Sequence, residues 1–459
     1  MGVKAVVLGA GSGTRMKGLL PKVIHPVAGR PLIRWVLDAV ALLDPEQTVV
    51  VVKPDADQVR AVLPDDVMPV VQSRQLGTAH ALQVALDCIT LGPDDHVLVV
   101  PADTPLVTGE TLGRLATLHR RTGSAVTCIT ANMDDPTGYG RVVRDGWDRV
   151  QRIVEHADTT TREREIKEIN GGIYMFDGEF ILDATGHVER NNAQGEYYLP
   201  DVVAILNAEG HSISAHLTDP EELAGVNTQD QLAEVASLMR SRINRAWMRQ
   251  GVWMQDPTRV YVDANVALEA GVRLYPGVHL EGATSVGAGA EIGPDTYVKD
   301  SWLGPGVRVW YSVVRGATIE AEAEVGPYAS IRPGAEFGEG AKAGSFVEVK
   351  NSAVGRGAKV PHLAYVGDAE VGDRANVGAG AITANYNGFE KHRTRIGDRA
   401  QVGSNTVLVA PVEVGDDAFT GAGSVITRNV SEGALGIERA TQREIPGYAK
   451  RRRARFEAG

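Results

Sequence analysis

A six-residue period runs through the second half of this sequence and strongly limits what that part of the chain can fold into. Aliphatic side chains recur at every sixth residue, often followed by Gly, as in "VGAGAEIGPD" and "IGDRAQVGSN". Such a repeat is typical of one face of a parallel β-helix, in which the aliphatic side chain points inward and small residues occupy the corners. The repeat passes through Val266, Val272 and Val278, Val286, Ile292 and Val298, Ile319, Val325 and Ile331, Val354, Val360 and Val366, and Ile396, Val402, Leu408 and Val414.

The period alone does not determine the handedness of this β-helix. The repeat resembles that of the left-handed hexapeptide β-helix, which is an exception to the right-handed crossover rule, and this resemblance implies a left-handed coil. The period is interrupted from Ala384 to Arg395, in "ANYNGFEKHRTR". Because loops that leave a rigid scaffold often carry function, we expect this excursion to contribute to a site.

Up to about residue 227, short apolar runs alternate with amphipathic stretches. The runs are "KAVVLGA", "TVVVVK", "HVLVVPAD" and "AVTCIT", and the stretches include 31–43, 78–89 and 109–121. This alternation predicts an α/β fold, with a mostly parallel, doubly wound sheet covered by helices on both faces. Ligands bind at the carboxyl ends of such strands, and both the segment from Gly9 to Arg15 and Asp103 lie there. We therefore expect them to share one crevice.

The changes of pattern give the domain boundaries. A chain of 459 residues is too long for one ordinary core. Between the two patterns, residues 228–250 predict one helix with apolar residues at spacings of three and four, which we interpret as a linker. The predicted organisation is an α/β domain at 1–227, a linker helix at 228–250, a β-helix at 251–437 and a C-terminal tail at 438–459.

The stretch "VVLGAGSGTRMKGLLPK", residues 6–22, predicts a phosphate-binding loop. An apolar strand runs directly into three glycines, whose neighbouring N–H groups can surround a phosphate. It is not a dinucleotide fingerprint, because Thr14 stands where the third Gly is required, and it lacks the Walker pattern. A glycine loop followed by Arg15 and Lys22 suits a triphosphate, since cations neutralise the charge of departing pyrophosphate. The alternative is a tight turn with a surface Arg and Lys.

Charge and cysteine content narrow the functional classes. With 47 basic and 58 acidic residues the formal net charge is -11, which argues against a general nucleic-acid surface. We interpret the basic run from Lys450 to Arg455 as a solvated tail. Cys88 and Cys128 can form no disulfide framework and lack metal-ligand spacing, so a reducing compartment is expected. The sequence has no signal-like N-terminus and no apolar run near the roughly 18 residues of a membrane span, which predicts a soluble, cytoplasmic protein.

The motifs resemble those of a known enzyme family. The glycine loop is similar to the signature of the sugar-1-phosphate nucleotidyltransferases, with Gly9 where that family commonly has Ala. Joined to the hexapeptide repeat, nearly the whole chain resembles the bifunctional N-acetylglucosamine-1-phosphate uridylyltransferases and glucosamine-1-phosphate N-acetyltransferases. The resemblance is carried by "QLGTAHA", "GYGRV", "EINGGIY", "AQGEYYLPD", "GVN", "FVEVKNS", "ITANYNG", "KHRTRIGD" and "VGSNT".

This resemblance implies two reactions in one chain. A left-handed β-helix would transfer an acetyl group from acetyl-CoA to glucosamine 1-phosphate, and a Rossmann-like domain would then transfer UMP from UTP and release pyrophosphate. The product, UDP-N-acetylglucosamine, feeds bacterial cell-envelope polysaccharides such as peptidoglycan. Hexapeptide acyltransferases are usually trimers with sites between subunits, so the resemblance also implies a homotrimer.

In the first domain, the resemblance assigns residues to UTP, the sugar phosphate and Mg²⁺. It places Leu8, Gly9, Gly11, Arg15 and Lys22 at UTP, Gln72, Gly77 and Thr78 at its uracil, Gly140, Glu155, Asn170 and Asn227 at the sugar phosphate, and Asp103 and Asn227 on the metal. A Gln side chain has both a donor and an acceptor for uracil, and Mg²⁺ accepts oxygen ligands. From the residues alone, Gln72 could be an ordinary surface residue and Asp103 a helix N-cap. The in-line attack needs no protein nucleophile, because positioning and charge neutralisation suffice.

In the second domain, His362 is the candidate general base. The ammonium of glucosamine 1-phosphate has no lone pair to attack a thioester, and His has an unperturbed pKa of roughly 6.5 that suits proton removal. His362 lies in the repeat where a small or apolar residue is expected, although a lone His is more often structural. The family that the chain resembles has its general base at this position. Glu348 could orient His362, since adjacent coils lie about 4.8 Å apart.

The resemblance also assigns the remaining residues of the acetyl-transfer site. It places Arg332 and Lys350 on the sugar phosphate, and Tyr365, Asn376 and Lys391 near the sugar. Asn385 and Tyr386, on the excursion, belong to the same pocket and to the acetyl-CoA site, and the cofactor would lie beside Ser404, Ala422 and Arg439. From the residues alone, Arg332 and Lys350 would be solvated cations of the β-helix surface.

Two departures from the family and two rival functions remain. Pro101 and Ala102 replace a common Tyr-Gly, so sugar contacts there are expected to differ, and Glu438 replaces a common Ser before Arg439. One rival is a monofunctional nucleotidyltransferase with an oligomerising β-helix. His362, Lys350 and the "NYNG" of the excursion argue against it, because a purely structural β-helix needs none of them. The other is a non-enzymatic sugar-nucleotide sensor, which the set of phosphate and metal residues makes a poor fit.

Overall fold

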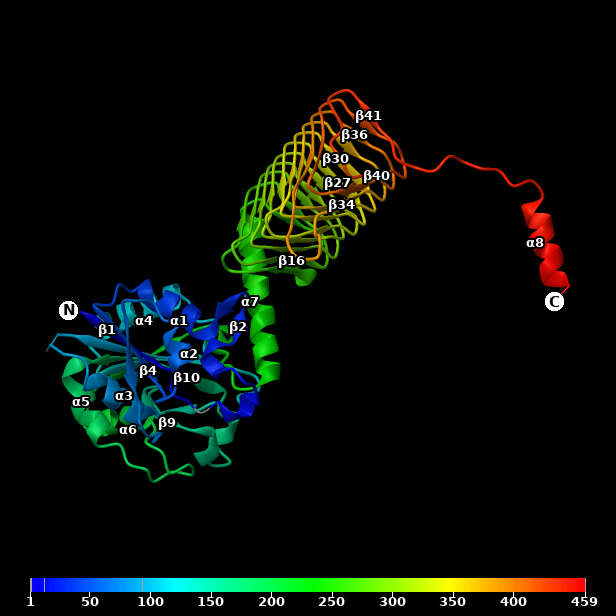
Figure 1. Cartoon of the computed structure of the whole chain (residues 1–459). Helices are drawn as coiled ribbons and strands as arrows, with labels where there is room; N and C mark the ends of the chain where they lie inside the picture. Colours follow the sequence, from blue (N-terminus) through cyan, green and yellow to red (C-terminus); the bar gives the residue numbers. More distant parts are fainter. Residues whose placement is uncertain (1, 12, 93, 459) are drawn as a thin grey trace. The chain divides into compact units, whose positions relative to one another are not determined.

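The computed structural model describes residues 2–11, 13–92 and 94–458. The chain divides into two compact units, Met1–Arg242 and Ile243–Gly459, which have separate hydrophobic cores. Figure 1 follows the chain from the first unit, in blue to green, through helix α7 (Gln229–Arg249) into the second, in green to red. No helix in the described ranges is long and apolar enough to cross a lipid bilayer.

A mostly parallel sheet forms the centre of the first unit. Its strand order is β11-β7-β10-β6-β1-β4-β5, and β10 alone on this path runs antiparallel to its neighbours. The hairpin of β8 and β9 joins β10. The strands are β1 Val3–Leu8, β4 Gln47–Val52, β5 Val67–Val71, β6 His96–Pro101, β7 Val126–Asn132, β8 Arg141–Arg144, β9 Val150–Val154, β10 Glu168–Asp177 and β11 Ile213–Leu217, with a small ladder of β2 Pro26–Val27 and β3 Arg30–Pro31.

Helices cover both faces of this sheet. Successive residues of β1 point to opposite faces, so Val6 packs in one core and Val7 in the other. Helices α3, α5 and α6 supply the first core, and α1 and α4 the second. The doubly wound fold predicted from the sequence is confirmed. The helices are α1 Leu32–Ala41, α2 Asp57–Arg60, α3 Thr78–Leu86, α4 Gly109–Thr122, α5 Gly178–Gly186 and α6 Asp201–Ala208, with 3-10 turns η1 Thr14–Met16, η2 Lys22–Ile24, η3 His156–Asp158, η4 Glu163–Glu165 and η5 Pro220–Leu223.

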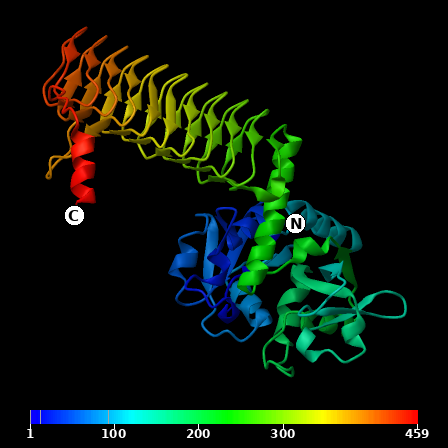
Figure 2. The same cartoon turned by 90° about the vertical axis from the view of Figure 1, so that its right-hand side faces the viewer.

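The second unit is a three-faced parallel β-helix, visible as stacked coils in Figure 2. Apart from β39, which pairs with β41, each strand pairs with the strand three further along the chain, so one turn of the chain contributes to all three faces. The first face contains β12 Trp253–Met254, β15 Arg273–Leu274, β18 Glu291–Ile292, β21 Arg308–Val309, β24 Glu324–Val325, β27 Lys342–Ser345, β30 Lys359–His362, β33 Asn376–Val377, β36 Gln401–Val402, β39 Phe419–Thr420 and β41 Leu435–Gly436. The second face contains β13 Val260–Val262, β16 Val278–Glu281, β19 Tyr297–Lys299, β22 Val313–Arg315, β25 Ser330–Ile331, β28 Glu348–Lys350, β31 Tyr365–Gly367, β34 Ile382–Ala384, β37 Val407–Val409 and β40 Val425–Ile426. The third contains β14 Ala267–Leu268, β17 Ser285–Val286, β20 Trp302–Leu303, β23 Thr318–Ile319, β26 Glu336–Phe337, β29 Ala353–Val354, β32 Ala369–Val371, β35 Thr394–Ile396 and β38 Val412–Val414.

The period read from the sequence is the packing period of this β-helix. Every aliphatic position of the repeat is at most 4% exposed and belongs to one continuous core. The predicted interruption is also present, between β34 and β35, although Thr394 and Arg395 already belong to β35. Beyond the β-helix, η6 (Pro257–Arg259) and α7 pack near its first strands, where buried Asn244 donates to Pro257 O and Val260 O, each at 2.8 Å. Helix α8 (Tyr448–Glu457) is exposed along its length.

Candidate active sites

A cavity of about 610 Å³ opens in the first unit at the carboxyl ends of β1 and β6. It brings together the glycine loop, the segment before α3, the middle of β10 and Asn227, two residues before α7. The expected crevice shared by the loop and Asp103 is therefore present. The predicted residues that line it are Leu8, Gly9, Gly11, Arg15, Lys22, Gln72, Gly77, Thr78, Asp103, Glu155, Asn170 and Asn227.

Close backbone contacts explain the glycines that follow β1. Gly9 N donates to Val51 O at 2.9 Å, and a Cβ at Gly9 would lie 3.1 Å from this oxygen. Gly13 has a φ of +63°, in the left-handed region that favours glycine, and it leads into the turn that carries Arg15. A Cβ at Gly11 would meet nothing within 4 Å, so the main chain there borders the open cavity. The loop is thus shaped to approach an anion closely.

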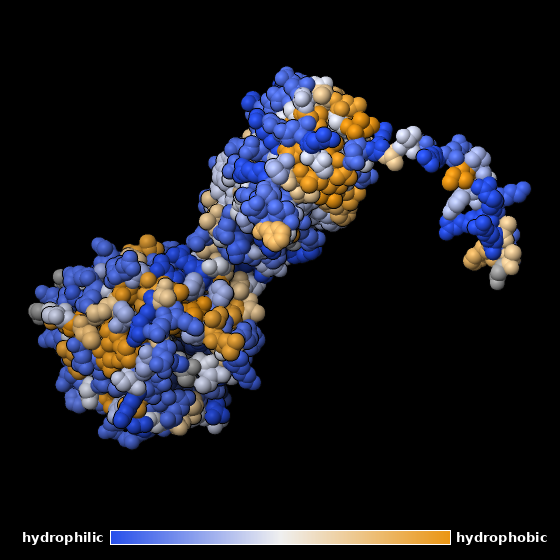
Figure 3. Space-filling model, viewed as in Figure 1, coloured by the Kyte–Doolittle hydropathy of each residue, from blue (hydrophilic) through white to orange (hydrophobic). Residues whose placement is uncertain are grey.

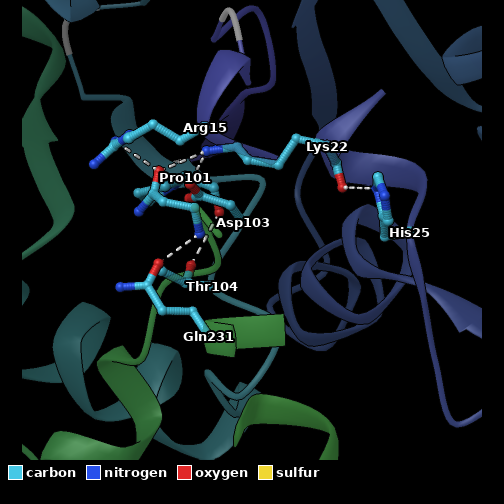
Figure 4. A network of polar contacts seen from close by, with 8 residues as sticks. Arg15, Lys22, His25, Pro101, Asp103, Thr104 and Gln231 are labelled. Carbon is cyan, nitrogen blue, oxygen red and sulfur yellow. Dashed lines mark hydrogen bonds and ion pairs between the residues drawn. The ribbon is translucent and has the colours of Figure 1, made fainter. Parts of the chain in front are cut away.

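Two cations and two side-chain oxygens converge beside this loop, where Figure 4 labels Arg15, Lys22 and Asp103. Lys22 Nζ forms an ion pair with Asp103 Oδ2 and donates to Asn227 Oδ1 at 3.1 Å. Arg15 donates to the same amide oxygen at 3.0 Å. The side chains of Lys22 and Asp103 are 12% and 19% exposed, so water screens their attraction only weakly. One cation therefore contacts both of the oxygens that were predicted to be metal ligands.

Main-chain hydrogen bonds hold Asp103 and Asn227, the two predicted metal ligands, in place. Val226 N donates to Asp103 O at 2.9 Å, which ties the segment before α7 to the end of β6. Asn227 N donates to Gln231 Oε1 at 2.8 Å. Sequence analysis missed Gln231. The Thr228-x-x-Gln231 spacing, which is typical of a helix-capping box, is the signal that could have indicated it.

The residues predicted to contact uracil form a second part of the cavity wall. Gln72 is 2% exposed, and its Nε2 donates to Gly77 O at 3.2 Å and lies 2.9 Å from His80 Nδ1. Because its amide nitrogen is used inside the protein, Gln72 offers a ligand an acceptor, Oε1, and not the donor that was also expected. Gly77 has a φ of +119°, and a Cβ there would lie 2.4 Å from Tyr197 O, so glycine is required. The Thr78 hydroxyl accepts a main-chain N–H at 3.0 Å.

Glu155 and Asn170 line another part of the cavity, and Gly140 lies directly behind them. A Cβ at Gly140 would be 3.5 Å from Asn170 Cβ and 3.6 Å from Glu155 Oε1. Asn170 Nδ2 donates to the Tyr174 hydroxyl at 2.7 Å. Burial raises the pKa of Glu155, and two nearby carboxylates, Asp201 first, raise it further. This part of the cavity therefore disfavours an additional negative charge and favours a neutral, hydrogen-bonding group.

Several lining residues were missed by sequence analysis. Gln194 and Glu196 lie inside "AQGEYYLPD", so that motif was the available signal. Of the Pro101-Ala102 pair, which departs from the family, Pro101 lines the cavity, whereas Ala102 is fully buried in the core. Altered contacts can therefore come directly from Pro101 only. The missed residues are Ala10, Thr14, Val23, Gln75, Ala81, Gly172, Tyr174, Gln194, Glu196, Leu199 and Pro200, whereas Gly13 was among the three glycines of the predicted phosphate-binding loop.

His362, the candidate base of the second unit, ends strand β30 on the first face. It is exposed and pairs in the main-chain ladder with Ser345. Within the described residues, no hydrogen bond to its imidazole is present. Glu348 lies on β28, on the second face, where Arg332 donates to its Oε1 at 2.7 Å. In this conformation Glu348 is thus paired with Arg332 and does not contact the imidazole.

Arg332, Lys350 and Lys391 form a cluster of cations. Arg332 and Lys350 occupy equivalent positions next to β25 and on β28, because the residues before them are paired in the ladder. Lys391, on the excursion, lies against Lys350 and is the main reason that the pKa of Lys350 is lowered. Two ammonium groups held together favour an anion between them. Tyr365 lies beside this cluster, since Gly367 is the ladder partner of Lys350 and a Cβ at Gly367 would be 2.3 Å from the Tyr365 hydroxyl.

Ser404, Ala422 and Arg439 follow one another along the β-helix. Gly423 N donates to Ser404 O at 2.8 Å between consecutive coils, and Arg439 donates to Ala422 O at 3.1 Å. The main-chain N–H of Glu438 donates to Ser424 Oγ at 3.1 Å, and the Glu438 side chain is exposed. This line of residues suits a long ligand that lies along the β-helix.

The remaining predicted residues of this site lie in two other parts of the β-helix. Asn376 lies on β33, and the other two lie on the excursion, where Tyr386 is 61% exposed. In the described ranges of one chain, no hydrogen bond joins these three residues to His362 or to Ser404.

Comparisons with known proteins cover both units. Residues 5–166 match the family described as MobA-like NTP transferase domain, and residues 393–428 match the bacterial transferase hexapeptide family (six repeats). The bifunctional protein GlmU of Streptomyces coelicolor is 47% identical over 453 residues, which cover 98% of this chain and 94% of that protein. The proteins of the same name from Streptomyces avermitilis and Brevibacillus brevis are both 45% identical, over 98% of this chain and 94% and 97% of their own lengths.

Proposed function

This chain belongs to the family of the bifunctional protein GlmU, and we propose that its two units divide the two reactions of that family between them. The protein acetylates glucosamine 1-phosphate with acetyl-CoA and transfers UMP from UTP to the product, which yields UDP-N-acetylglucosamine and pyrophosphate. The first unit carries uridylyl transfer, and the β-helix carries acetyl transfer. The observation that best supports this assignment is the convergence of Lys22, Arg15, Asp103 and Asn227 beside the glycine loop.

Asp103 and Asn227 are the proposed ligands of Mg²⁺. The fit is supported by the ammonium of Lys22, a cation that already contacts an oxygen of each residue. A carboxylate and an amide oxygen, completed by phosphate and water, are the ligands that this ion accepts. When bound, Mg²⁺ would polarise the phosphates of UTP and orient them.

In uridylyl transfer, a phosphate oxygen of N-acetylglucosamine 1-phosphate attacks the α-phosphorus of UTP. The new P–O bond forms as the bond to pyrophosphate breaks, so no covalent intermediate with the protein is needed. The glycine loop would hold the phosphates, while Arg15 and Lys22 neutralise the leaving charge. Gln72 Oε1 would accept the N3–H of uracil. Gly140, Glu155 and Asn170 would bind the sugar, whose acetamido group is neutral and so suits their part of the cavity.

In acetyl transfer, His362 is the proposed general base. It removes a proton from the ammonium of glucosamine 1-phosphate, the free amine attacks the thioester carbonyl, and the C–S bond breaks to release CoA thiolate, which takes a proton. The exposed imidazole is accessible for this step. Arg332, Lys350 and Lys391 would bind the sugar phosphate, near Tyr365 and Asn376. Acetyl-CoA would lie along Ser404, Ala422 and Arg439, and Glu348 would act on His362 after release from Arg332.

We also propose that the chain forms a homotrimer through its β-helix. Ile382, Val407 and Val425 are paired across β34, β37 and β40 and point outward, and Figure 3 shows an apolar surface, in orange, over this part. Leu363, next to His362, is 63% exposed. Large apolar surfaces on soluble proteins are usually covered by a partner. A second copy of the chain is the proposed partner, because it would bring further residues to His362. Sedimentation equilibrium should give three times the 49.0 kDa chain mass, and a monomer with full acetyl-transfer activity would contradict the proposal.

One assay tests both reactions and their order. Purified protein receives glucosamine 1-phosphate, acetyl-CoA, UTP and Mg²⁺, and free CoA thiol and pyrophosphate are followed separately while each substrate is omitted in turn. We expect thiol without UTP, and pyrophosphate only when acetyl-CoA or ready-made N-acetylglucosamine 1-phosphate is present. Pyrophosphate without any thiol would show that the β-helix is not catalytic and that the role of His362 is wrong. UTP and acetyl-CoA are metabolites of the cell interior, so we propose that the enzyme acts in the cytoplasm.

A further inference from the structure

A buried carboxylate lies at the base of the excursion of the β-helix. Asp368, between β31 and β32, is 6% exposed and has a φ of +50°. Each of its oxygens accepts a hydrogen bond from a different amide. Asn351 Nδ2 donates to Oδ1 at 2.5 Å, and Asn385 Nδ2 donates to Oδ2. The carboxylate therefore links the coil below to the first residues of the excursion above.

Asp368 remains ionised in this position. Burial alone would raise its pKa, but the hydrogen bonds from Asn351 and Asn385 and the nearby charges of Lys391 and Lys350 more than offset that effect and lower the pKa. Asp368 thus adds a fixed negative charge behind the cations that are proposed to bind the sugar phosphate.

The charge of Asp368 determines which end of the Asn385 amide faces outward. An ionised carboxylate can only accept hydrogen bonds, so the amide nitrogen must point at it and the amide oxygen must point away. Asn385 is 8% exposed, and its Nδ2 is also 3.5 Å from the Tyr365 hydroxyl. Its Oδ1 receives no hydrogen bond from the described residues, yet it is not among the buried polar atoms that lack a partner. Oδ1 is therefore an acceptor that is open to a ligand.

We propose that Asp368 is a positioning residue for acetyl transfer, which holds Asn385 with Oδ1 outward so that this oxygen accepts an N–H of the amino sugar. The inference rests on the acetyl-transfer function proposed above for this site. A primary amine has two N–H groups and one lone pair. When one N–H is bound by Asn385, rotation about the C–N bond is restricted and the lone pair can be aimed at the thioester carbon. A donor at the same place would repel the amine hydrogens.

The test exchanges the two side chains. In Asp368→Asn, an amide with one acceptor and one donor end replaces a carboxylate that accepts through both oxygens. With the new oxygen toward Asn351, its NH₂ faces Asn385, and the Asn385 amide turns its nitrogen outward. We expect kcat/KM for glucosamine 1-phosphate to fall about 30-fold, the scale of one hydrogen bond to a charged or reacting group, with KM for acetyl-CoA unchanged. Asn385→Asp alone places a second carboxylate opposite that of Asp368, so its kcat/KM should be equally low. In the double variant Asp368→Asn, Asn385→Asp, the amide donates to the carboxylate and an acceptor again points outward, so most of the loss should be recovered.

Asn351→Gly is the matched control. It removes the other hydrogen bond to Asp368 and suits the left-handed φ of +45° at this position, but it leaves the outward oxygen of Asn385 unchanged. We expect less than about a 3-fold change in kcat/KM, because no hydrogen bond to substrate is altered. If Asp368 only stabilised the excursion, this control and Asp368→Asn would be similarly impaired, which would overturn the inference.

Two further readouts separate the possible failures. Uridylyl transfer from ready-made N-acetylglucosamine 1-phosphate, measured on the same samples, reports on folding of the chain. Absence of acetyl transfer in the unaltered protein would contradict the proposed function itself. An active protein in which Asp368→Asn keeps full kcat/KM, or in which the exchanged pair is no better than the single variants, would contradict the role of Asp368 alone.

Discussion

The ammonium of Lys22 occupies the place between the two proposed metal ligands, so removal of this side chain should strengthen metal binding to the protein without substrates. In the structure Lys22 forms an ion pair with Asp103 and donates to Asn227 at 3.1 Å. A divalent cation that binds both oxygens must first displace the ammonium. Lys22→Ala abolishes this competition and should therefore raise metal affinity, although it should also abolish most uridylyl transfer.

The size of the effect follows from the interactions that the metal must break. A hydrogen bond to a charged group contributes about 1.5 to 3 kcal/mol. The upper part of this range is not reached by exposed pairs, but Lys22 and Asp103 are only 12% and 19% exposed. With about 2 kcal/mol released, Lys22→Ala should bind the ion roughly 30-fold more tightly.

Mn²⁺ provides the assay, because its electron paramagnetic resonance signal counts the free ion directly. Titrations without nucleotide should give a lower Kd for Lys22→Ala than for the unaltered protein. Lys17→Asn is the control, since it removes an exposed positive charge from the same segment and Asn tolerates the left-handed φ of +49°. Its Kd should change about 3-fold at most, the scale of an exposed charge. If Lys22→Ala binds Mn²⁺ no more tightly, the ammonium and the metal do not share these ligands.

Three other predictions concern separate parts of the first unit. Asp103→Ala should abolish UDP-sugar formation and leave acetyl transfer intact, and loss of both reactions in a folded variant would argue against separate sites. Gly77→Ala should disrupt the part of the cavity wall that is predicted to contact uracil, because its Cβ would lie 2.4 Å from Tyr197 O. The KM for UTP should rise at least about 10-fold, the scale of an overpacked contact. An unchanged KM would show that UTP does not contact this part of the wall. Burial lowers the pKa of His119 to about 4, below its ordinary 6.5. Because the unfolded chain takes up this proton first, stability of the first unit should decline as pH falls from 6.5 to 4, by about 3 kcal/mol. Chemical unfolding of His119→Gln should show a flatter pH dependence over this range, and an identical slope would exclude the mechanism.

The β-helix could be predicted because its signal is local. A six-residue period requires no knowledge of distant contacts, and Val354, Val360 and Val366 are at most 1% exposed. The parallel sheet of the first unit was likewise indicated by alternating runs. The antiparallel direction of β10 was not, because an apolar run has the same composition in either direction and the choice depends on how the chain returns to the sheet.

The site could be predicted as a set of residues but not as a network. The glycine loop and Asp103 follow strands, so their meeting in one cavity followed from the fold class. The pairing of Lys22 with Asp103 joins residues 81 positions apart, and packing decides which cation reaches which carboxylate. Gln72 offers two polar ends in the sequence, and only the position of Gly77 O determines that the acceptor faces the cavity. Asp368 has no motif, since its role depends on the amides of adjacent coils.

The excursion has a consequence for how such proteins can change over evolutionary time. Lys359 pairs with Asn376, 17 positions on, whereas Asn376 pairs with Gln401, 25 positions on, and Gln401 pairs with Phe419 in the ordinary spacing again. The added residues leave at a corner and return to the same ladder, so the strands above and below keep their register. Insertions at corners are therefore nearly neutral for folding, and new chemistry can be selected there one loop at a time without redesign of the core.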